Sequence, residues 1–451
     1  MRRAPRKGAV LLISGLCLLS LAGCRPKDQT PPAGQPATEP GGQPAAYQPT
    51  VDTTCLASQS WITQPNPPGD VPKNASNCEF QQFSWQWFLK LVSPAQPGSN
   101  ERTFEDNTQY PVLGVDACPG KVSSVQLAQE SRGLGVRIRK QRGPAPFKFV
   151  LPEDIDQAGS DNPLFDQNGK VVYYNTQYTP NECGITQGID TGFPNKPGDT
   201  VTELKLSWRQ ITPAEAPRYY SIQATIVSGG TSQQVLLGLV GFHIVKNAPN
   251  HPEFIWASFE HKDNAPDCDG TEPIPAAGWS FASAKCAACL NNPYDGDCGS
   301  YLSDVCKFNI YQGMNKAANI CRAIPNGGGS LENQTNIQSL NTQIAGFLNS
   351  LPADNPMAVF KNYFLVGTLW IKNPNSPIAP WFQDGSTALL NTTLESYDQL
   401  GGPNNTAANC FTCHNFNGAE NTTAISHILP IPTAQQRPGA GGPNTTQQMK
   451  K

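Results

Sequence analysis

Charged residues are scarce in this sequence. Only 15% of its 451 residues are Asp, Glu, Lys or Arg, and the formal net charge is −3. Four of the 32 basic residues lie within the first seven positions, so the remainder of the chain carries 28 basic and 35 acidic residues, a net charge of −7. Such an acidic balance does not favour binding to phosphate backbones, and nucleic acid is not expected as a partner.

Several signatures of common protein classes are also missing. The sequence has no internal repeat, no Gly-rich phosphate-binding loop and no Gly-x-Ser-x-Gly turn. These absences argue against repeat proteins, nucleotide-binding folds and α/β-hydrolases. Glycine and proline, by contrast, number 40 and 42. Because both destabilise helix interiors, a loop-rich fold with few long helices is expected.

The first 23 residues read as an export leader. A basic start is followed by an apolar stretch, Ala9 to Leu19, that is too short to span a bilayer. Leu21-Ala22-Gly23-Cys24 resembles a lipobox, which implies that Cys24 is lipidated and anchors the chain to the bilayer. Arg25 after the cysteine resembles, in a Gram-negative cell, the default sorting to the inner leaflet of the outer membrane, facing the periplasm. A plain secretory leader or a membrane anchor is the alternative.

Two flanking segments are expected to lie outside the folded part. Residues 24–50 are rich in Pro, Gly, Gln and Ala, and so few large apolar side chains cannot offset the entropy of ordering the chain. We interpret this segment as a disordered tether, and residues 437–451 as a disordered tail.

Cysteine is abundant for a chain of this size, with 14 residues. Ten remain after those assigned to the leader, the lipobox and a motif described below: Cys55, Cys78, Cys118, Cys183, Cys268, Cys286, Cys289, Cys298, Cys306 and Cys321. An even number in an oxidising compartment predicts up to five disulfides, with a disulfide-rich lobe at residues 286–321. A zinc site built from Cys286, Cys289, Cys298 and Cys306 is the alternative.

The spacing of apolar residues predicts an α+β fold with an antiparallel β-rich core and flanking helices in residues 51–385. Helices are expected at residues 78–92 and 336–350, the second stopped by Pro352. Alternating apolar and polar residues predict an antiparallel β-meander over residues 201–261. Residues 136–150 and 170–178 are further strand candidates.

One chemical motif stands out near the C-terminus, Cys410-Phe411-Thr412-Cys413-His414. In a CxxCH motif the two thiols form thioethers with the vinyl groups of haem, and the adjacent histidine ligates the iron. The motif therefore predicts one covalently bound haem c, held by Cys410, Cys413 and His414. A disulfide beside an unrelated histidine is the alternative.

The position of this motif is unusual, because only 37 residues follow His414. A complete cytochrome c domain cannot be built from them, so the haem must pack against upstream chain. We expect a small helical haem-binding segment at residues 386–436, with a helix that begins at a capping box of Thr392 and Glu395 and ends at Gly401. The strand-like residues 364–370 are expected to form another wall.

Beyond the motif, several stretches resemble the bacterial single-haem cytochrome c family proteins, exported lipoproteins with a β-rich N-terminal region and a C-terminal CxxCH. The resemblance spans about residues 75–430 and is carried by residues 204–209, 241–245, 254–261, 263–266, 391–395 and 426–428. No settled reaction is attached to this family, so the resemblance implies a haem protein without naming a substrate.

Four histidines lie outside the motif. We expect His243 and His261 to be hydrogen-bonded structural residues; if the strands form a hairpin, His243 lies near Ile255, and the two histidines cannot share an iron. The alternative makes His261, beside Glu260, a distal acid–base group. His251 is expected in a solvated loop.

The sixth iron ligand is expected to be His427, which lies in an apolar stretch 13 residues beyond His414. A histidine that only hydrogen-bonds a haem propionate or faces solvent is the alternative, and Met314 and Met357 would need the fold to deliver them. These features favour an electron-transfer haemoprotein with a redox partner protein. A haem enzyme with an open, peroxidase-like site and a haem-based redox or gas sensor remain alternatives.

Overall fold

The structure is a computed structural model. It describes the backbone of residues 54–113, 148–150, 155, 157, 162–182, 200–228, 231–291, 298, 305–372, 382–399 and 408–414. The leader, the lipobox cysteine Cys24, the tether, His427 and the C-terminal tail all lie outside these residues, so the predictions made for them remain predictions.

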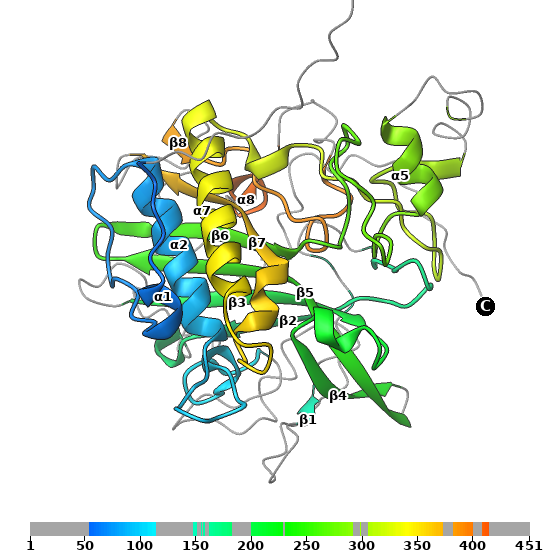
Figure 1. The fold of residues 1–451 in the computed structure, drawn as a ribbon, viewed down its shortest axis with the longest axis horizontal. Coiled ribbons are helices and arrows are strands. Elements are labelled where there is room, and N and C mark those ends of the chain that lie inside the picture. Colours follow the sequence, from blue (N-terminus) through cyan, green and yellow to red (C-terminus); the bar gives the residue numbers. More distant parts are fainter. Residues whose placement is uncertain are drawn as a thin grey trace, which may run out of the picture. The chain divides into compact units, whose positions relative to one another are not determined.

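An eight-stranded sheet forms the core, as Figure 1 shows. Its main order is β1-β4-β5-β6-β7-β8, and β2 and β3 extend it from the other edge of β5. All pairings are antiparallel except that of β1 with β4. The strands are β1 (Lys148–Val150), β2 (Tyr173–Tyr178), β3 (Thr202–Gln210), β4 (Ser221–Ser228), β5 (Thr231–Ala248), β6 (His251–His261), β7 (Tyr363–Ile371) and β8 (Gln383–Gly385). The expected α+β class with an antiparallel β-rich core is confirmed.

The topology around β5 corrects the expected meander. One edge of this long strand pairs with β3, while the other pairs first with β4 and then with β6. The strands therefore do not follow one another side by side in sequence order. A β-bulge between Lys246 and Ala248 also shifts the hairpin register, so that His243 lies opposite Ser258 rather than near Ile255.

Two long helices run side by side across one face of the sheet (Figure 1). Helix α2 (Asn77–Val92) begins at a capping box in which Ser76 and Glu79 satisfy each other's backbone N–H groups. Helix α7 (Leu331–Asn349) begins at Ser330. Their apolar faces bury Phe88, which stacks on Phe259 of β6 with ring centroids 4.2 Å apart. Both predicted helices are confirmed, the second starting five residues earlier than expected.

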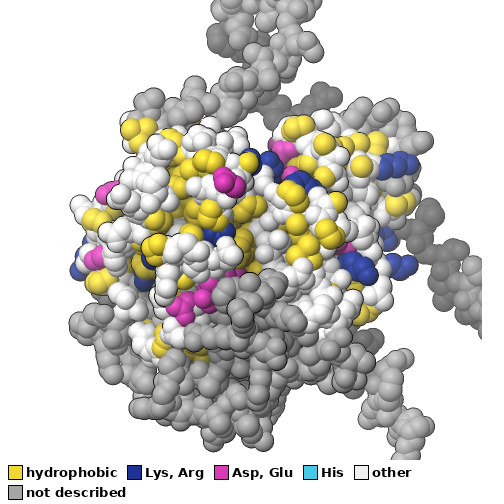
Figure 2. All heavy atoms as spheres, turned by 60° about the horizontal axis from the view of Figure 1, so that its bottom comes forward, with side chains coloured by type: hydrophobic (Ala, Val, Ile, Leu, Met, Phe, Trp, Pro, Cys, Tyr) yellow, Lys and Arg dark blue, Asp and Glu magenta, His cyan; other side chains and the backbone are white. Residues whose placement is uncertain are grey.

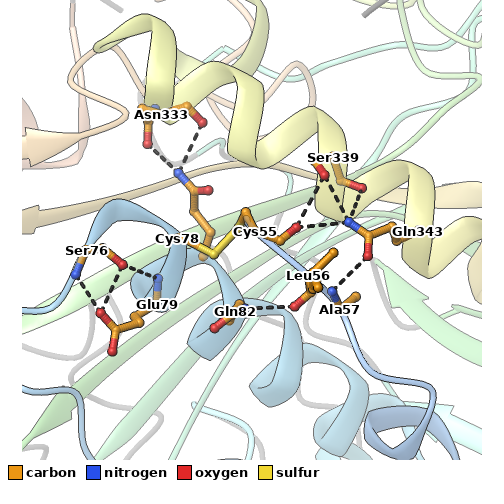
Figure 3. Close-up of a disulfide and its surroundings, with 11 residues drawn as sticks. Cys55, Leu56, Ala57, Ser76, Cys78, Glu79, Gln82, Asn333, Ser339 and Gln343 are labelled. Carbon is orange, nitrogen blue, oxygen red and sulfur yellow. Dashed lines mark hydrogen bonds between the residues drawn. A yellow bond between two sulfur atoms is a disulfide. The ribbon is translucent and has the colours of Figure 1, made fainter. Parts of the chain in front are cut away.

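A disulfide fastens the start of the folded chain to this helical layer (Figure 3). Cys55 is bonded to Cys78 in the first turn of α2. The carbonyl oxygen of Cys55 accepts a hydrogen bond of 3.0 Å from Gln343 of α7, whose Oε1 accepts one from the backbone N–H of Ala57. The entering chain is thus tied to both helices.

The other face of the sheet is covered by irregular chain and by the short helix α8 (Cys410–Cys413), while helix α5 (Ala284–Asn291) packs within the disulfide-rich lobe. Residues 391–399 run along this face as a series of turns, so the helix expected from Thr392 is absent. Its capping residues are used elsewhere: Thr392 donates to Glu260, and Glu395 contacts His243. Gly241 permits the close approach, since a Cβ there would lie 2.3 Å from Thr393 Oγ1.

Disulfides hold the lobe as expected. Three join cysteines of its loops: Cys268–Cys321, Cys286–Cys306 and Cys289–Cys298. The pairing of the last two engages all four cysteines of the alternative zinc site, and within the described residues no group of His, Cys, Asp and Glu is arranged to hold a metal ion. The zinc interpretation is therefore wrong. Cys118 and Cys183 lie outside the described residues.

The described surface is mixed in character. On the face drawn in Figure 2, apolar and uncharged groups predominate, and Lys, Arg, Asp and Glu side chains are scattered among them. Five of the largest exposed apolar side chains belong to residues 274–324, in and beside the lobe: Ile274, Val305, Ile310, Met314 and Ile324. Among the described helices, none has the length and apolar character required to cross a membrane.

Candidate haem-attachment site

The CxxCH motif folds as a single helical turn. Helix α8 begins after Asn409, whose backbone N–H donates to Thr412 Oγ1 over 3.1 Å. The backbone N–H of His414 donates to the carbonyl of Cys410 over 2.9 Å and closes the turn. The backbone of the motif from Cys410 to Cys413 is therefore helical.

The side chain of Asn409 attaches this turn to the sheet by two hydrogen bonds. The Asn409 amide nitrogen donates to Gln383 Oε1 over 2.6 Å and to the carbonyl of Thr387 over 2.7 Å. Gln383 opens β8, and Thr387 lies two residues beyond the end of that strand. The motif is therefore held at a defined place on the sheet by hydrogen bonds that do not involve the three predicted haem-binding residues.

Trp256, in the middle of β6, is the platform beneath the motif. Its indole makes an edge-to-face contact with Phe411 at 5.8 Å between ring centroids, and it lies 4.8 Å from the imidazole of His414. Phe411 is buried and packs in a cluster with side chains of β2, β5, β6 and β7: Tyr178, Val245, Phe254, Val366, Leu369 and Ile371. Burying a side chain of this size stabilises the docked turn by about 1.5–3 kcal/mol.

This cluster confirms part of the expected arrangement. Residues of β7 form a wall beside the motif, as predicted for the strand-like residues 364–370. Residues 391–395 lie on the same face of β6, where Asn391 donates to Ser258 Oγ over 3.0 Å. Residues 391–395 form turns there rather than the expected helix.

A row of directly paired residues passes under the motif. The strand registers align Tyr178 of β2, Glu203 of β3, Val245 of β5, Trp256 of β6, Leu369 of β7 and Gly385 of β8. Directly opposite residues of paired strands point to the same face of the sheet. A buried carboxyl group, that of Glu203, therefore belongs to the same row as the Trp256 platform.

The motif residues fit a covalently attached haem in their exposure and surroundings. Phe411 faces the sheet and is 2% exposed, whereas Cys410 and His414 lie half-buried at the rim of the apolar cluster. A thiol and an imidazole at the edge of an aromatic and aliphatic wall provide the reactive groups and the apolar contact surface that a porphyrin requires. Cys410, Cys413 and His414 would hold the haem there.

The two side chains of the alternative distal site, His261 and Glu260, are both engaged in hydrogen bonds within the fold. His261 points to the helical side of the sheet and lies five residues along β6 from Trp256, about 17 Å at 3.3 Å per residue. Its Nδ1 accepts from the N–H of Asp263, its Nε2 donates to the carbonyl of Arg218 over 2.9 Å, and its ring stacks on Tyr219. Burial lowers the pKa of His261 to about 4, so the ring is a neutral structural residue, as the leading expectation held.

The carboxylate of Glu260 is likewise engaged in hydrogen bonds within the fold. Its carboxylate accepts from the backbone N–H and the hydroxyl of Thr392, both over 2.6 Å, and from Arg322 over 3.0 Å. Arg322 in turn pairs with Asp267. This network, which the sequence patterns did not indicate, fastens residues 391–393 and the lobe to β6.

His243 and His251 are also bonded within the fold. His243 donates to Glu395 Oε1 over 2.9 Å. Burial acts to raise the pKa of Glu395, but His243 and the N–H of Asn391 stabilise its carboxylate and lower the pKa overall. His251 is fully buried against Phe80 and Glu253, so its assignment to a solvated loop is wrong; the two-residue turn before it places it directly in β6.

The described methionines do not approach the motif. Met357 is buried in the cluster beneath α2 and α7, on the opposite face of the sheet, and Met314 is 59% exposed in the lobe.

Sequence patterns found the motif but missed its platform and its anchor, Trp256 and Asn409. Trp256 belongs to a stretch quoted for the family resemblance, yet no local spacing connects it to a turn far downstream. Comparisons of the chain with protein-family models, with curated proteins and with solved structures find no match.

Proposed function

We propose that this protein is a c-type cytochrome of the bacterial cell envelope, with one haem attached through Cys410 and Cys413, ligated by His414, and used for electron transfer. The observation that carries this proposal is the docking of the CxxCH turn on Trp256, where Phe411 is buried and the reactive residues remain at the rim. When bound, the haem would supply a one-electron couple. The family resemblance and the oxidising compartment implied by four disulfides agree with this proposal.

Trp256 has a specific part in this function as a positioning residue. A His414 imidazole that packs against a fixed indole has its ring orientation restricted, and the orientation of the axial ligand affects the electronic state of the iron. The surrounding apolar side chains would exclude water from one side of the haem. Both effects favour a stable, reversible couple.

The sixth ligand in this proposal is His427. Among the described residues His243, His251 and His261 are engaged elsewhere, and both described methionines are away from the motif. Two histidine ligands would keep the iron six-coordinate, which suits electron transfer.

The enzyme and sensor alternatives require an open iron position. Within the described part of the chain, the acid–base candidates that would serve a peroxidase-like reaction, Glu260 and His261, are both hydrogen-bonded within the fold. We therefore propose electron transfer in preference to an enzymatic or a sensor function.

An optical spectrum of the purified protein, reduced with and without carbon monoxide, tests this choice. Electron transfer predicts a low-spin spectrum that carbon monoxide does not change. A high-spin haem that binds carbon monoxide would instead support the enzyme or sensor function.

We further propose that lipid attached to Cys24 anchors the protein to the inner leaflet of the outer membrane. The folded part would then face the periplasm. Cys24→Ala should release it into the soluble periplasmic fraction. A variant that stays with the membrane fraction would show that another element anchors it.

A further inference from the structure

A pair of buried acidic side chains lies at the end of the residue row that passes under the motif. Glu203 of β3 and Glu182 of η2 (Pro180–Glu182) are both fully buried. Thr179 donates to Glu182 Oε1 over 2.7 Å, while Glu182 Oε2 is buried without a hydrogen-bond partner. A buried carboxylate oxygen left in this state is costly, and a bound proton removes the cost.

The two carboxyl groups also interact with each other. Burial, and next the charge of Glu203, raise the pKa of Glu182 well above its usual value. Two neighbouring carboxylates cannot both ionise cheaply, so the pair titrates as a unit whose second ionisation is shifted to higher pH.

The pair is close to the candidate haem site. Glu203 is opposite Val245, which is opposite Trp256, so two strand spacings of about 4.8 Å separate the backbone of Glu203 from that of Trp256. Tyr178, opposite Glu203 on β2, and Val245 both belong to the cluster that buries Phe411. Apolar side chains with little capacity to screen charge therefore fill the space between the acid pair and the motif.

Charged and titratable groups of the neighbouring strands surround the pair. On β5, Lys246 donates to Thr202 and lies over the ring of Trp87 of α2. Burial lowers the pKa of Lys246 to about 8, although Glu182 acts to raise it. On β2 the facing group is Tyr178, and farther along β3 Lys205 is near the Glu395–His243 pair. Lys246 balances one negative charge and leaves the second carboxyl to be neutralised by a proton.

We propose that the Glu182–Glu203 pair is a proton-binding site coupled to the haem, which takes up a proton when the haem gains an electron and releases it on oxidation. This inference rests on the proposed function. In the coupled step the redox partner supplies one electron to the ferric iron, solvent supplies one proton, and one carboxylate becomes a carboxylic acid. The proton balances the charge of the electron, so the net charge of the site is unchanged. Because charges are poorly screened in a buried location, this balance favours the coupling there.

Spectroelectrochemical titration of the haem-loaded protein from pH 5 to pH 9 tests the coupling. The midpoint potential should fall as the pH rises, by up to about 59 mV per pH unit between the ferric-state and ferrous-state pKa values of the pair. Glu203→Gln and Glu182→Gln should each reduce this slope, and the double variant should abolish it. Glu105→Gln provides the control, because Glu105 is buried on the helical side of the sheet beside Tyr220.

A second readout does not require the haem. Infrared difference spectra of the unloaded protein should show a protonated carboxyl band near neutral pH that changes in both single variants and is lost in the double variant. A pH-independent potential, or a slope that persists in the double variant, would overturn the inference while the cytochrome assignment stands. Failure to bind haem covalently would overturn the proposed function instead, and the infrared band would still decide whether the pair holds a proton.

Discussion

The imidazole of His414 lies 4.8 Å from the indole of Trp256, with the two ring planes inclined at 43°. The two residues are far apart in the sequence, and the contact joins the end of the described chain to the central part of the sheet. In the proposed haem site, residues upstream in the sequence, on β5, β6 and β7, would supply the apolar wall.

Trp256→Leu should loosen this site. The substitution removes the ring contacts with His414 and Phe411 and leaves a cavity, and should lower the free energy of unfolding by about 2–4 kcal/mol. Trp256→Phe should retain most of the stability but shift the midpoint potential, because His414 loses the surface that orients it.

Trp208→Phe serves as the matched control, since this buried indole lies on the helical side of the sheet and bonds Asn175. Its potential should equal that of the wild type. Equal potentials for Trp256→Phe and the wild type would remove the positioning role from Trp256.

His261 should make the fold sensitive to acid. Its pKa in the folded state is about 4, below the value of 6.5 for an unperturbed histidine, so it contributes stability that is present in full above pH 6.5 and is lost as the pH falls to 4. The fully buried ring predicts a loss of about 3 kcal/mol over that range. His261→Gln should flatten the curve of unfolding free energy against pH between 6.5 and 4, measured by urea denaturation. An unchanged slope in this variant would assign the acid sensitivity to other groups.

The Cys55–Cys78 disulfide should stabilise the helical layer. It closes a loop with a sequence separation of 23 residues, and the loss of that constraint on the unfolded chain corresponds to about 3 kcal/mol. Denaturant unfolding of the Cys55→Ala/Cys78→Ala double variant measures this loss. A stability equal to that of the wild type would mean that the bonds from Gln343 suffice to hold the entering chain.

His427→Ala tests the sixth ligand. If His427 ligates the iron, its removal should convert a low-spin haem into a high-spin one that binds carbon monoxide when reduced. His251→Ala is the control, because His251 is buried away from the motif and bonded to Glu253. Identical spectra for the wild type and His427→Ala would exclude His427 as the ligand.

The parts of the fold that follow local periodicity were predictable. The apolar spacing of α2 and α7 and the alternation in β3, β4 and β6 are properties of short stretches of chain, and the structure has these elements where they were expected. The pairings of β5 with β4 and with β6 agree with the expected meander. The pairing of β5 with β3, and the register set by the bulge at residues 246–248, were not predictable from local patterns. Thr392 and Glu395 have the spacing of a capping box, but bonds to Glu260 and His243 outweigh the helical preference.

In the candidate site, too, only the local pattern could be predicted from the sequence. CxxCH is a local pattern and could be recognised directly. Its anchor Asn409, its platform Trp256 and the neighbouring pair Glu182 and Glu203 come together only through the strand registers. Sequence spacing carries no information on such contacts between distant segments.

The mass of the intact protein under denaturing conditions tests the central claim most directly. Protein from cells that mature c-type cytochromes should carry one additional haem mass, which persists through acid–acetone extraction, and the Cys410→Ala/Cys413→Ala double variant should lack it. The account would be contradicted if the wild type lacked the added haem mass, as the variant should. It would also be contradicted if the wild type lost its haem on extraction.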